Sequence, residues 1–430
     1  SLISLYLPYN HQLSSMIVPL FVAGCLMSFT DALKTYESHQ VLRCKPTTRD
    51  QLDKLHDLSE NSDWDFWMEP KRIGGEVDIL VTPENKLEVS STMKKLGVDC
   101  RVMIEDVSAL MAKEKKVSSK ATDSYFDSYH TWEEVKEWTE DLAKEFPQYA
   151  KTSVIGQTYE GRDIQILTMS TDPSANKPTL WFDAGIHARE WIAVPTVSYI
   201  ADTLLRGYGT PSGANSTYLL DTYDVIVCPI INVDGYAYTW DEDRMWRKTR
   251  SINKGNACVG VDPNRNWDFH WGEAGTSPVS CSDSYQGPSA ASEVEVQTVQ
   301  SYICDHPNIK GYINFHAYSQ LWMSNWGYTD ELPPDYADQN ALSKAATDAI
   351  KSVHGMTYEY GPIATTIYPA SGSSADYTYG VCGVKYSYGV ELRDTGEFGF
   401  LLPPEEIIPS GEEIFAAVVA MGEYIEAHPY

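Results

Sequence analysis

LWFDAGIHAREW, residues Leu180 to Trp191, joins a short apolar run to the start of a helical pattern. Leu180–Phe182 is typical of a buried strand, and Trp191–Leu205 is typical of a helix. His187 and Glu190 therefore lie just after a strand, at the edge where open α/β sheets place their binding sites. Histidine and glutamate are ligands that Zn²⁺ accepts. The stretch predicts a metal site, although a histidine that stands alone at a strand end is more often structural.

Two more polar residues end apolar strands farther along the chain. His316 follows the run Gly311–Phe315, and Glu391 follows Val384–Val390. Two histidines and one glutamate would hold a tetrahedral zinc ion with one open position, as catalytic zinc sites require. A buried Glu391 is costly unless it is paired or functional. It is either a general base that activates a water molecule beside the metal or the partner of Arg393 in a structural salt bridge.

The segments around these strand ends alternate between strand and helix patterns. Such alternation predicts an α/β fold with a mixed, mostly parallel sheet that helices cover on both faces. We assign this architecture to a catalytic domain over residues 122–430. Further strands are expected at Ile164–Met169 and Val225–Ile231, further helices at Ser292–Cys304 and Leu342–Val353, and capping boxes at Thr131 with Glu134, Ser292 with Glu295 and Ser410 with Glu413.

Residues 33–112 have a strand and helix pattern of their own. Its order is β-α-β-β-α-β, which predicts a small α+β domain of the ferredoxin-like kind. The first and last strands of that arrangement are neighbours, so Cys44 and Cys100 could form a disulfide. Strands are expected at Val41–Cys44, Trp64–Met68, Val77–Val81 and Arg101–Ile104, and helices at Thr48–Leu58 and Asn85–Leu96.

Two short segments flank this small domain. Residues 1–32 have the apolar run and the small residues, Thr30 and Ala32, of a leader and signal peptide, and Met16 is a candidate for the true start. Residues 113–121 form a polar, lysine-rich linker. A short polar segment between structured parts is a natural protease site, and a plain connection is the alternative.

The acidic composition limits the classes of partner. The formal net charge is −27 at pH 7, and such a field repels nucleic acid and anionic membranes, so neither is expected as a partner. The acidity is explained equally well as a means of keeping a secreted protein soluble. With the signal peptide and a glycosylation sequon at Asn215, the sequence predicts a secreted, extracellular protein, with a digestive lumen as the simplest setting.

Five separated motifs make the chain resemble a known enzyme family. They are GIHAREW at 185–191, RMWRKTR at 244–250, VDPNRNW at 261–267, TIYPASG at 366–372 and ELRDTG at 391–396. In this order they resemble the zinc metallocarboxypeptidases of the carboxypeptidase A/B family, over nearly the whole chain after the signal peptide. The resemblance implies a procarboxypeptidase, which is a zinc-dependent hydrolase of C-terminal peptide bonds preceded by an activation propeptide at 33–112.

The resemblance implies a role for each matching residue. Glu391 is implied as the base that activates the attacking water and later protonates the leaving amine. Arg247 is implied to stabilise the oxyanion. The other implied roles are His187, Glu190 and His316 as zinc ligands, Asn264, Arg265 and Tyr368 as the grip on the substrate carboxylate, Arg189 and Arg244 along the substrate channel, Asp262 as the residue that orients His187, and Cys258 with Cys281 as a disulfide.

The pocket for the terminal side chain decides which residue is released. Ala375 matches the position that is Asp in the basic-specific branch of the family, so an Arg or Lys side chain would be buried here without a counter-charge. A preference for bulky apolar or aromatic termini is therefore expected. A register shift of one residue would bring Asp376 into the pocket and reverse this preference. The other implied wall positions are Met323, Gly327, Ile363, Ile367 and Gly389, with Asn314 as the polar exception.

The resemblance also implies partners. They are peptide or protein C-termini as substrate, the propeptide as inhibitor, and a trypsin-like protease that cuts near Lys116 or Lys120. A monomer is expected. Cys228, Cys304 and Cys382 have no assigned partner. Two rival functions stay open: a zinc amidase that acts on small N-acyl amino acids, and a catalytically inactive binding protein of the same family.

Overall fold

The computed structural model describes residues 33–61, 64–114 and 124–430. The signal peptide expected at 1–32 lies outside the described residues, as do Lys116 and Lys120 of the expected cleavage region. None of the helices among the described residues has both the length and the apolar composition that a transmembrane helix needs.

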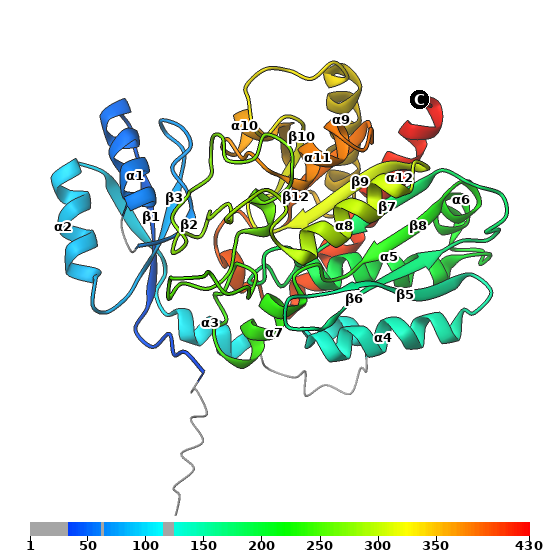
Figure 1. Ribbon diagram of the computed structural model, residues 1–430, viewed down its shortest axis with the longest axis horizontal. Coiled ribbons are helices and arrows are strands. Elements are labelled where there is room, and N and C mark those ends of the chain that lie inside the picture. Colours follow the sequence, from blue (N-terminus) through cyan, green and yellow to red (C-terminus); the bar gives the residue numbers. More distant parts are fainter. Residues whose placement is uncertain (1–32, 62–63, 115–123) are drawn as a thin grey trace, which may run out of the picture. The chain divides into compact units, whose positions relative to one another are not determined.

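The N-terminal domain is built on a four-stranded antiparallel sheet with the strand order β2-β3-β1-β4 (Figure 1). The element order β-α-β-β-α-β is the predicted one. Strand β1 pairs with β4 so that Cys44 lies opposite Cys100, and the two form the disulfide that this topology allows. The elements are β1 (Gln40–Lys45), α1 (Arg49–Asn61), β2 (Asp65–Met68), β3 (Val77–Val81), α2 (Lys86–Leu96), β4 (Asp99–Ile104) and a further helix, α3 (Val107–Glu114).

The larger domain contains an eight-stranded mixed sheet with the order β11-β10-β12-β9-β7-β8-β6-β5. The pairs β11–β10, β12–β9, β9–β7 and β7–β8 are parallel, and the other three pairs are antiparallel. This confirms a mixed, mostly parallel sheet. The strands are β5 (Ala150–Gln157), β6 (Asp163–Met169), β7 (Thr179–Asp183), β8 (Asp224–Cys228), β9 (Ile309–His316), β10 (Leu321–Ser324), β11 (Glu359–Pro362) and β12 (Tyr386–Glu391).

Helices cover both faces of this sheet (Figure 1). Helix α12 contacts α5, α9 and strand β9, whereas α8 and α11 contact each other. The α-helices are α4 (Trp132–Glu145), α5 (Ala193–Gly207), α6 (Ala214–Thr222), α7 (Val233–Asp241), α8 (Val294–Asp305), α9 (Tyr336–His354), α10 (Ile363–Thr366), α11 (Ser374–Gly380) and α12 (Ile407–Ala427). Short 3₁₀ turns are η1 (Tyr125–Asp127), η2 (Pro263–Arg265), η3 (Gly399–Leu401) and η4 (Pro404–Glu406).

One of the three predicted capping boxes is present. Thr131 accepts from the backbone of Glu134, and the Glu134 side chain accepts from the backbone of Thr131, so α4 begins as predicted. Helix α8 has Glu293 rather than Ser292 at its N-cap, and α12 begins three residues before Ser410. These two predictions were wrong because the glutamates that should complete the boxes have distant partners.

The predicted strand Val225–Ile231 was also too long, because β8 ends at Cys228. Pro229 follows at once, and a proline cannot donate a ladder hydrogen bond. The remaining elements were not predicted; they are β5, β10, β11, α3, α6, α7, α10 and α11.

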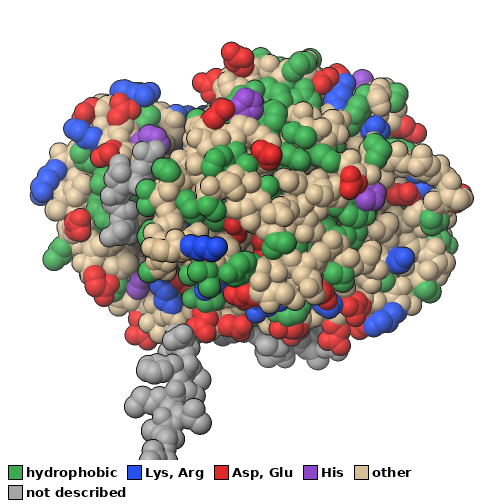
Figure 2. Space-filling view, viewed as in Figure 1, with side chains coloured by type: hydrophobic (Ala, Val, Ile, Leu, Met, Phe, Trp, Pro, Cys, Tyr) green, Lys and Arg blue, Asp and Glu red, His purple; other side chains and the backbone are tan. Residues whose placement is uncertain are grey.

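The cysteines stabilise both domains. The implied pair Cys258–Cys281 is bonded, and a third disulfide joins Cys304 to Cys382, which the sequence left unassigned. Cys228 is buried and is the free thiol among the described residues. On the surface, acidic side chains are interspersed with Lys and Arg over the face shown in Figure 2 rather than gathered in one patch.

Candidate active site

His187, Glu190 and His316 come together at one edge of the eight-stranded sheet. Strands β7 and β9 are adjacent and parallel; His187 and Glu190 lie in the turn after β7, and His316 is the last residue of β9. The two histidine Nδ1 atoms are 3.1 Å apart. The Glu190 carboxylate lies 2.8 Å from His187 Nδ1 and 2.9 Å from His316 Nδ1. Residues far apart in the sequence therefore share one cluster.

The donor atoms of this cluster suit a zinc ion. One ligand atom from each residue lies within 4.8 Å of the other two, and all three residues are buried. The other ring nitrogen of His187 lies 3.0 Å from Asp262 Oδ1, which fixes the ring and leaves Nδ1 available to a metal. Burial opposes ionisation of Glu190, but the two imidazoles outweigh burial and keep the pKa of this carboxyl well below its usual range. Such a set leaves one position of a tetrahedral zinc open.

Glu391 lies beside the cluster because it is the last residue of β12 and pairs in register with His316. Burial raises the pKa of Glu391 to about 8, and the nearby His316 offsets part of this effect. Its Oε2 atom has no hydrogen-bond partner among the described residues. Arg393 bonds Glu413 and Glu406. The alternative salt bridge between Arg393 and Glu391 is therefore not formed, and Glu391 lines the cavity.

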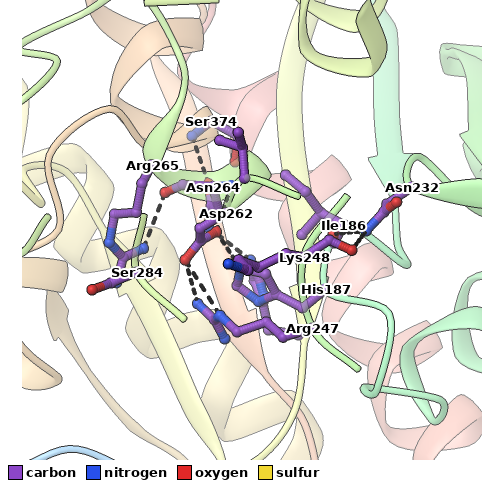
Figure 3. A network of polar contacts seen from close by, with 12 residues as sticks. Ile186, His187, Asn232, Arg247, Lys248, Asp262, Asn264, Arg265, Ser284 and Ser374 are labelled. Carbon is purple, nitrogen blue, oxygen red and sulfur yellow. Dashed lines mark hydrogen bonds and ion pairs between the residues drawn. The ribbon is translucent and has the colours of Figure 1, made fainter. Parts of the chain in front are cut away.

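The cavity that contains His187, Glu190 and His316 is also lined by Arg247, Asn264 and Arg265. Arg247 donates from Nη2 to Asp262 Oδ2 over 2.8 Å, and the Asp262 carboxylate also receives the backbone N–H of Asn264 (Figure 3). Arg265 donates to the backbone oxygen of Gly275 over 2.8 Å. Asp262 thus orients Arg247 and a ring of the metal cluster with one carboxylate. Burial opposes its ionisation, but the neighbouring cations hold its pKa well below the usual range.

Tyr368 lies near Arg265 on this polar side of the cavity. It follows α10 and lines the cavity, and its ring centre lies 5.5 Å from the Arg265 guanidinium. Burial raises the pKa of Tyr368, so its hydroxyl stays protonated at neutral pH and can donate a hydrogen bond.

The far end of the cavity is largely apolar. Ala375 lines it, whereas Asp376 does not. Asp376 is fully buried and accepts hydrogen bonds from Asn325 and from the backbone N–H groups of Gly327 and Tyr328. Burial raises the pKa of Asp376 to about 6, although these hydrogen bonds act to lower it. Gly327 therefore holds the Asp376 carboxylate and does not line the cavity. The other implied wall residues do line it; they are Met323, Ile363, Ile367 and Gly389.

The two outer arginines are both engaged by the N-terminal domain. Arg189 lines the cavity and lies 3.2 Å from Asp65 of β2. Arg244 is fully buried outside the cavity lining and makes two hydrogen bonds to the carboxylate of Glu114, at 2.8 and 2.9 Å. The structure thus brings Arg189, but not Arg244, to the cavity.

Sequence reasoning missed the cavity residues that come from the N-terminal domain. Phe66, Trp67, Met68 and Glu69 line the cavity beside the metal cluster. Trp67 packs on Phe400 of the larger domain, with ring centres 5.1 Å apart. No signal in the sequence marks this segment, because its place depends on how one folded domain docks on another.

Comparisons with known proteins identify the family of this chain. A family model described as zinc carboxypeptidase matches residues 135–417, and one described as carboxypeptidase activation peptide matches residues 42–114. Carboxypeptidase A1 of Rattus norvegicus is 40% identical over 420 residues, which cover 96% of this chain and 99% of the relative. Carboxypeptidase B of Astacus astacus is 46% identical over 301 residues, which cover 70% of this chain and 97% of the relative.

Solved structures of carboxypeptidases have a similar fold. The crystal structure of the carboxypeptidase A from Helicoverpa armigera matches with a TM-score of 0.83 at 29% identity, covering 92% of this chain and 99% of that chain. The chain therefore belongs to the zinc carboxypeptidase family, and it carries the activation peptide of that family ahead of the catalytic domain.

Proposed function

We propose that this zinc carboxypeptidase precursor, once its activation domain is removed, hydrolyses the C-terminal peptide bond of peptides and releases a bulky apolar or aromatic residue. The observation that carries the proposal is that one cavity is lined by four kinds of group. They are Glu391, the three potential metal ligands, a cationic wall formed by Arg247 and Arg265, and an uncharged far end around Ala375. Relatives named carboxypeptidase A1 and carboxypeptidase B both match, so the lining of the pocket, and not the names of the relatives, supports the choice of released residue.

The cationic wall accounts for action at a chain end. Arg265 would pair with the terminal carboxylate of the substrate, because a guanidinium presents parallel N–H groups that fit a carboxylate. Asn264 and the hydroxyl of Tyr368 would complete the grip. A peptide bond in the middle of a chain has no carboxylate to offer there, so it would leave these groups unpaired.

The chemical step would use Glu391 and Arg247. Zinc, held by His187, Glu190 and His316, would act as a Lewis acid and would lower the pKa of the attacking water towards neutral pH. Glu391 would take the proton of the attacking water and later give it to the leaving amine, for which a raised pKa is suitable. Arg247, fixed by Asp262, would donate to the oxyanion as it forms and needs no reorganisation at that moment.

The uncharged far end supports release of apolar residues. A Lys or Arg side chain would be buried beside Ala375 without a counter-charge, at a cost of several kcal/mol. Asp376 cannot serve as that counter-charge in this geometry, because Asn325, Gly327 and Tyr328 already hold its carboxylate.

The activation domain would inhibit by occupying the groups that a peptide needs. Asp65 engages Arg189 and Glu114 engages Arg244, and residues from β2 line the cavity. Cleavage near Lys116 or Lys120 by a trypsin-like protease, in a secreted and monomeric precursor, would free Arg189 for the substrate and would remove the Glu114 partner of Arg244.

The test treats the purified precursor with trypsin and assays peptides that end in Phe, Leu, Arg or Glu, with and without a zinc chelator. The proposal expects release of Phe and Leu that appears after trypsin and disappears with chelator. Faster release of Arg than of Phe would refute the apolar pocket. Release from N-acyl amino acids alone would point to the amidase, and no release by folded, zinc-loaded protein would point to a binding protein.

A further inference from the structure

The floor of the specificity pocket is one row of residues that crosses the sheet. Met323 of β10 pairs with Gly389 of β12, and Gly389 pairs with Asn314 of β9. Asn314 in turn pairs with Asp183 of β7. Residues that pair across neighbouring strands point to the same face of a sheet. The row therefore runs from an apolar end at Met323, through a position without a side chain, to a polar end at Asn314.

Gly389 leaves real space in the middle of this row. A Cβ atom built on Gly389 meets no other atom within 4 Å, although the residue lies in the interior of a fully buried strand. Ala375, which faces the cavity from α11, is also small. A substrate side chain can therefore extend across Gly389 farther than the apolar walls alone would require, and its tip would come to Asn314.

Asn314 is oriented and fully buried at that end. Its Nδ2 donates to Asp183 Oδ1, and its Oδ1 accepts from the Ser374 hydroxyl over 3.3 Å. Asp183 is itself fixed by Trp181 Nε1 at 2.7 Å. An amide group has two N–H donors and two acceptor positions, and these bonds use one of each. One donor and one acceptor position of the amide have no partner among the described residues.

We infer that Asn314 is a specificity-determining residue that favours C-terminal tyrosine and tryptophan over phenylalanine and leucine, because their hydroxyl or indole N–H can bond the free positions of its amide. This inference rests on the proposed function and narrows its substrate class. A pocket built to hydrogen-bond a substrate discriminates against the analogue that lacks the group, because its own polar atoms then stay unpaired. A pocket with an apolar floor would prefer phenylalanine, since it would bury the tyrosine hydroxyl without a partner.

The experiment compares kcat/KM of the trypsin-activated, zinc-loaded enzyme on matched peptides that end in Tyr, Phe, Trp or Leu. Wild-type enzyme should release Tyr about fivefold or more faster than Phe, a ratio that corresponds to one net neutral hydrogen bond. Asn314→Leu keeps a similar volume and should bring this ratio to about one or below. Ser410→Ala removes a buried, unpartnered hydroxyl in α12 that does not line the cavity, and should leave the ratio unchanged.

A second variant keeps the test open if Asn314→Leu does not fold. Gly389→Ala adds one methyl group where the protein has room for it, and it should lower release of Trp and Tyr relative to Leu. Faster release of Phe than of Tyr by the wild type, or ratios that neither variant changes, would overturn the inference and leave the proposed function intact. No release of any residue would overturn the proposed function and the inference with it.

Discussion

Replacing Glu114 with glutamine should loosen the activation domain in the uncut precursor. Glu114 and Arg244 form a two-point ion pair at 2.8 and 2.9 Å, with side chains that are 1% and 0% exposed. Loss of one charge from such a buried pair leaves the other uncompensated, which costs about 3–5 kcal/mol. Arg244 also donates to the backbone oxygens of Arg189 and Phe400, so the low end applies. A loss of about 3 kcal/mol shifts the docking equilibrium about 150-fold.

The assay is hydrolysis of a small peptide substrate before any trypsin is added, expressed as a fraction of the rate after trypsin. Glu114→Gln precursor should show a much larger fraction than the wild type and a lower thermal unfolding midpoint of the activation domain. Glu88→Gln makes the same change on the exposed face of α2 and should behave as the wild type. If Glu114→Gln precursor were as silent and as stable as the wild type, the ion pair would not be what holds the domain in place.

Three further predictions concern the site and the buried acids. Glu391→Gln should lower kcat by about 10²–10⁴-fold with unchanged zinc content, because it removes general-base catalysis; kinetics and metal analysis check this, and a fully active variant would contradict it. Burial raises the pKa of Glu295 to about 7, so the folded state holds this proton more tightly than the unfolded state and stability falls as pH rises through 7. Glu295→Gln should therefore gain stability over the wild type between pH 5 and pH 8 in denaturant titrations, and parallel pH curves would refute the assignment. Ala375→Asp should raise release of Arg relative to Phe by tenfold or more in matched peptides, and an unchanged ratio would mean that this position does not face the terminal side chain.

Local patterns in the sequence were enough to predict much of this protein. The two alternation patterns predicted both architectures, and the box of Thr131 with Glu134 marked the start of α4 correctly. The topology of the small domain also brought Cys44 to Cys100. The site was predictable in part because His187, His316 and Glu391 all follow strands of one sheet, and strand ends of parallel neighbours meet at one edge.

Other features depended on long-range partners, which no local pattern encodes. The boxes at Ser292 and Ser410 were wrong because Glu295 accepts from the backbone of Tyr159, and Glu413 pairs with Arg393. The same holds for the choice between Ala375 and Asp376. A shift of one residue on α11 decides which side chain faces the cavity, and only the bonds of Asp376 to Asn325 and Gly327 show it.

The amino-acid sequence alone was enough to predict the enzyme family, because its motifs with His187, Glu190, His316 and Glu391 stand at the ends of strands. Contacts between the two domains and between neighbouring strands could be known only from the tertiary structure. Docking of one domain on the other pairs Glu114 with Arg244, and strand register aligns Met323, Gly389 and Asn314 in one row. Both depend on which surfaces and strands become neighbours, and the free energy that selects those neighbours comes from packing of the whole core.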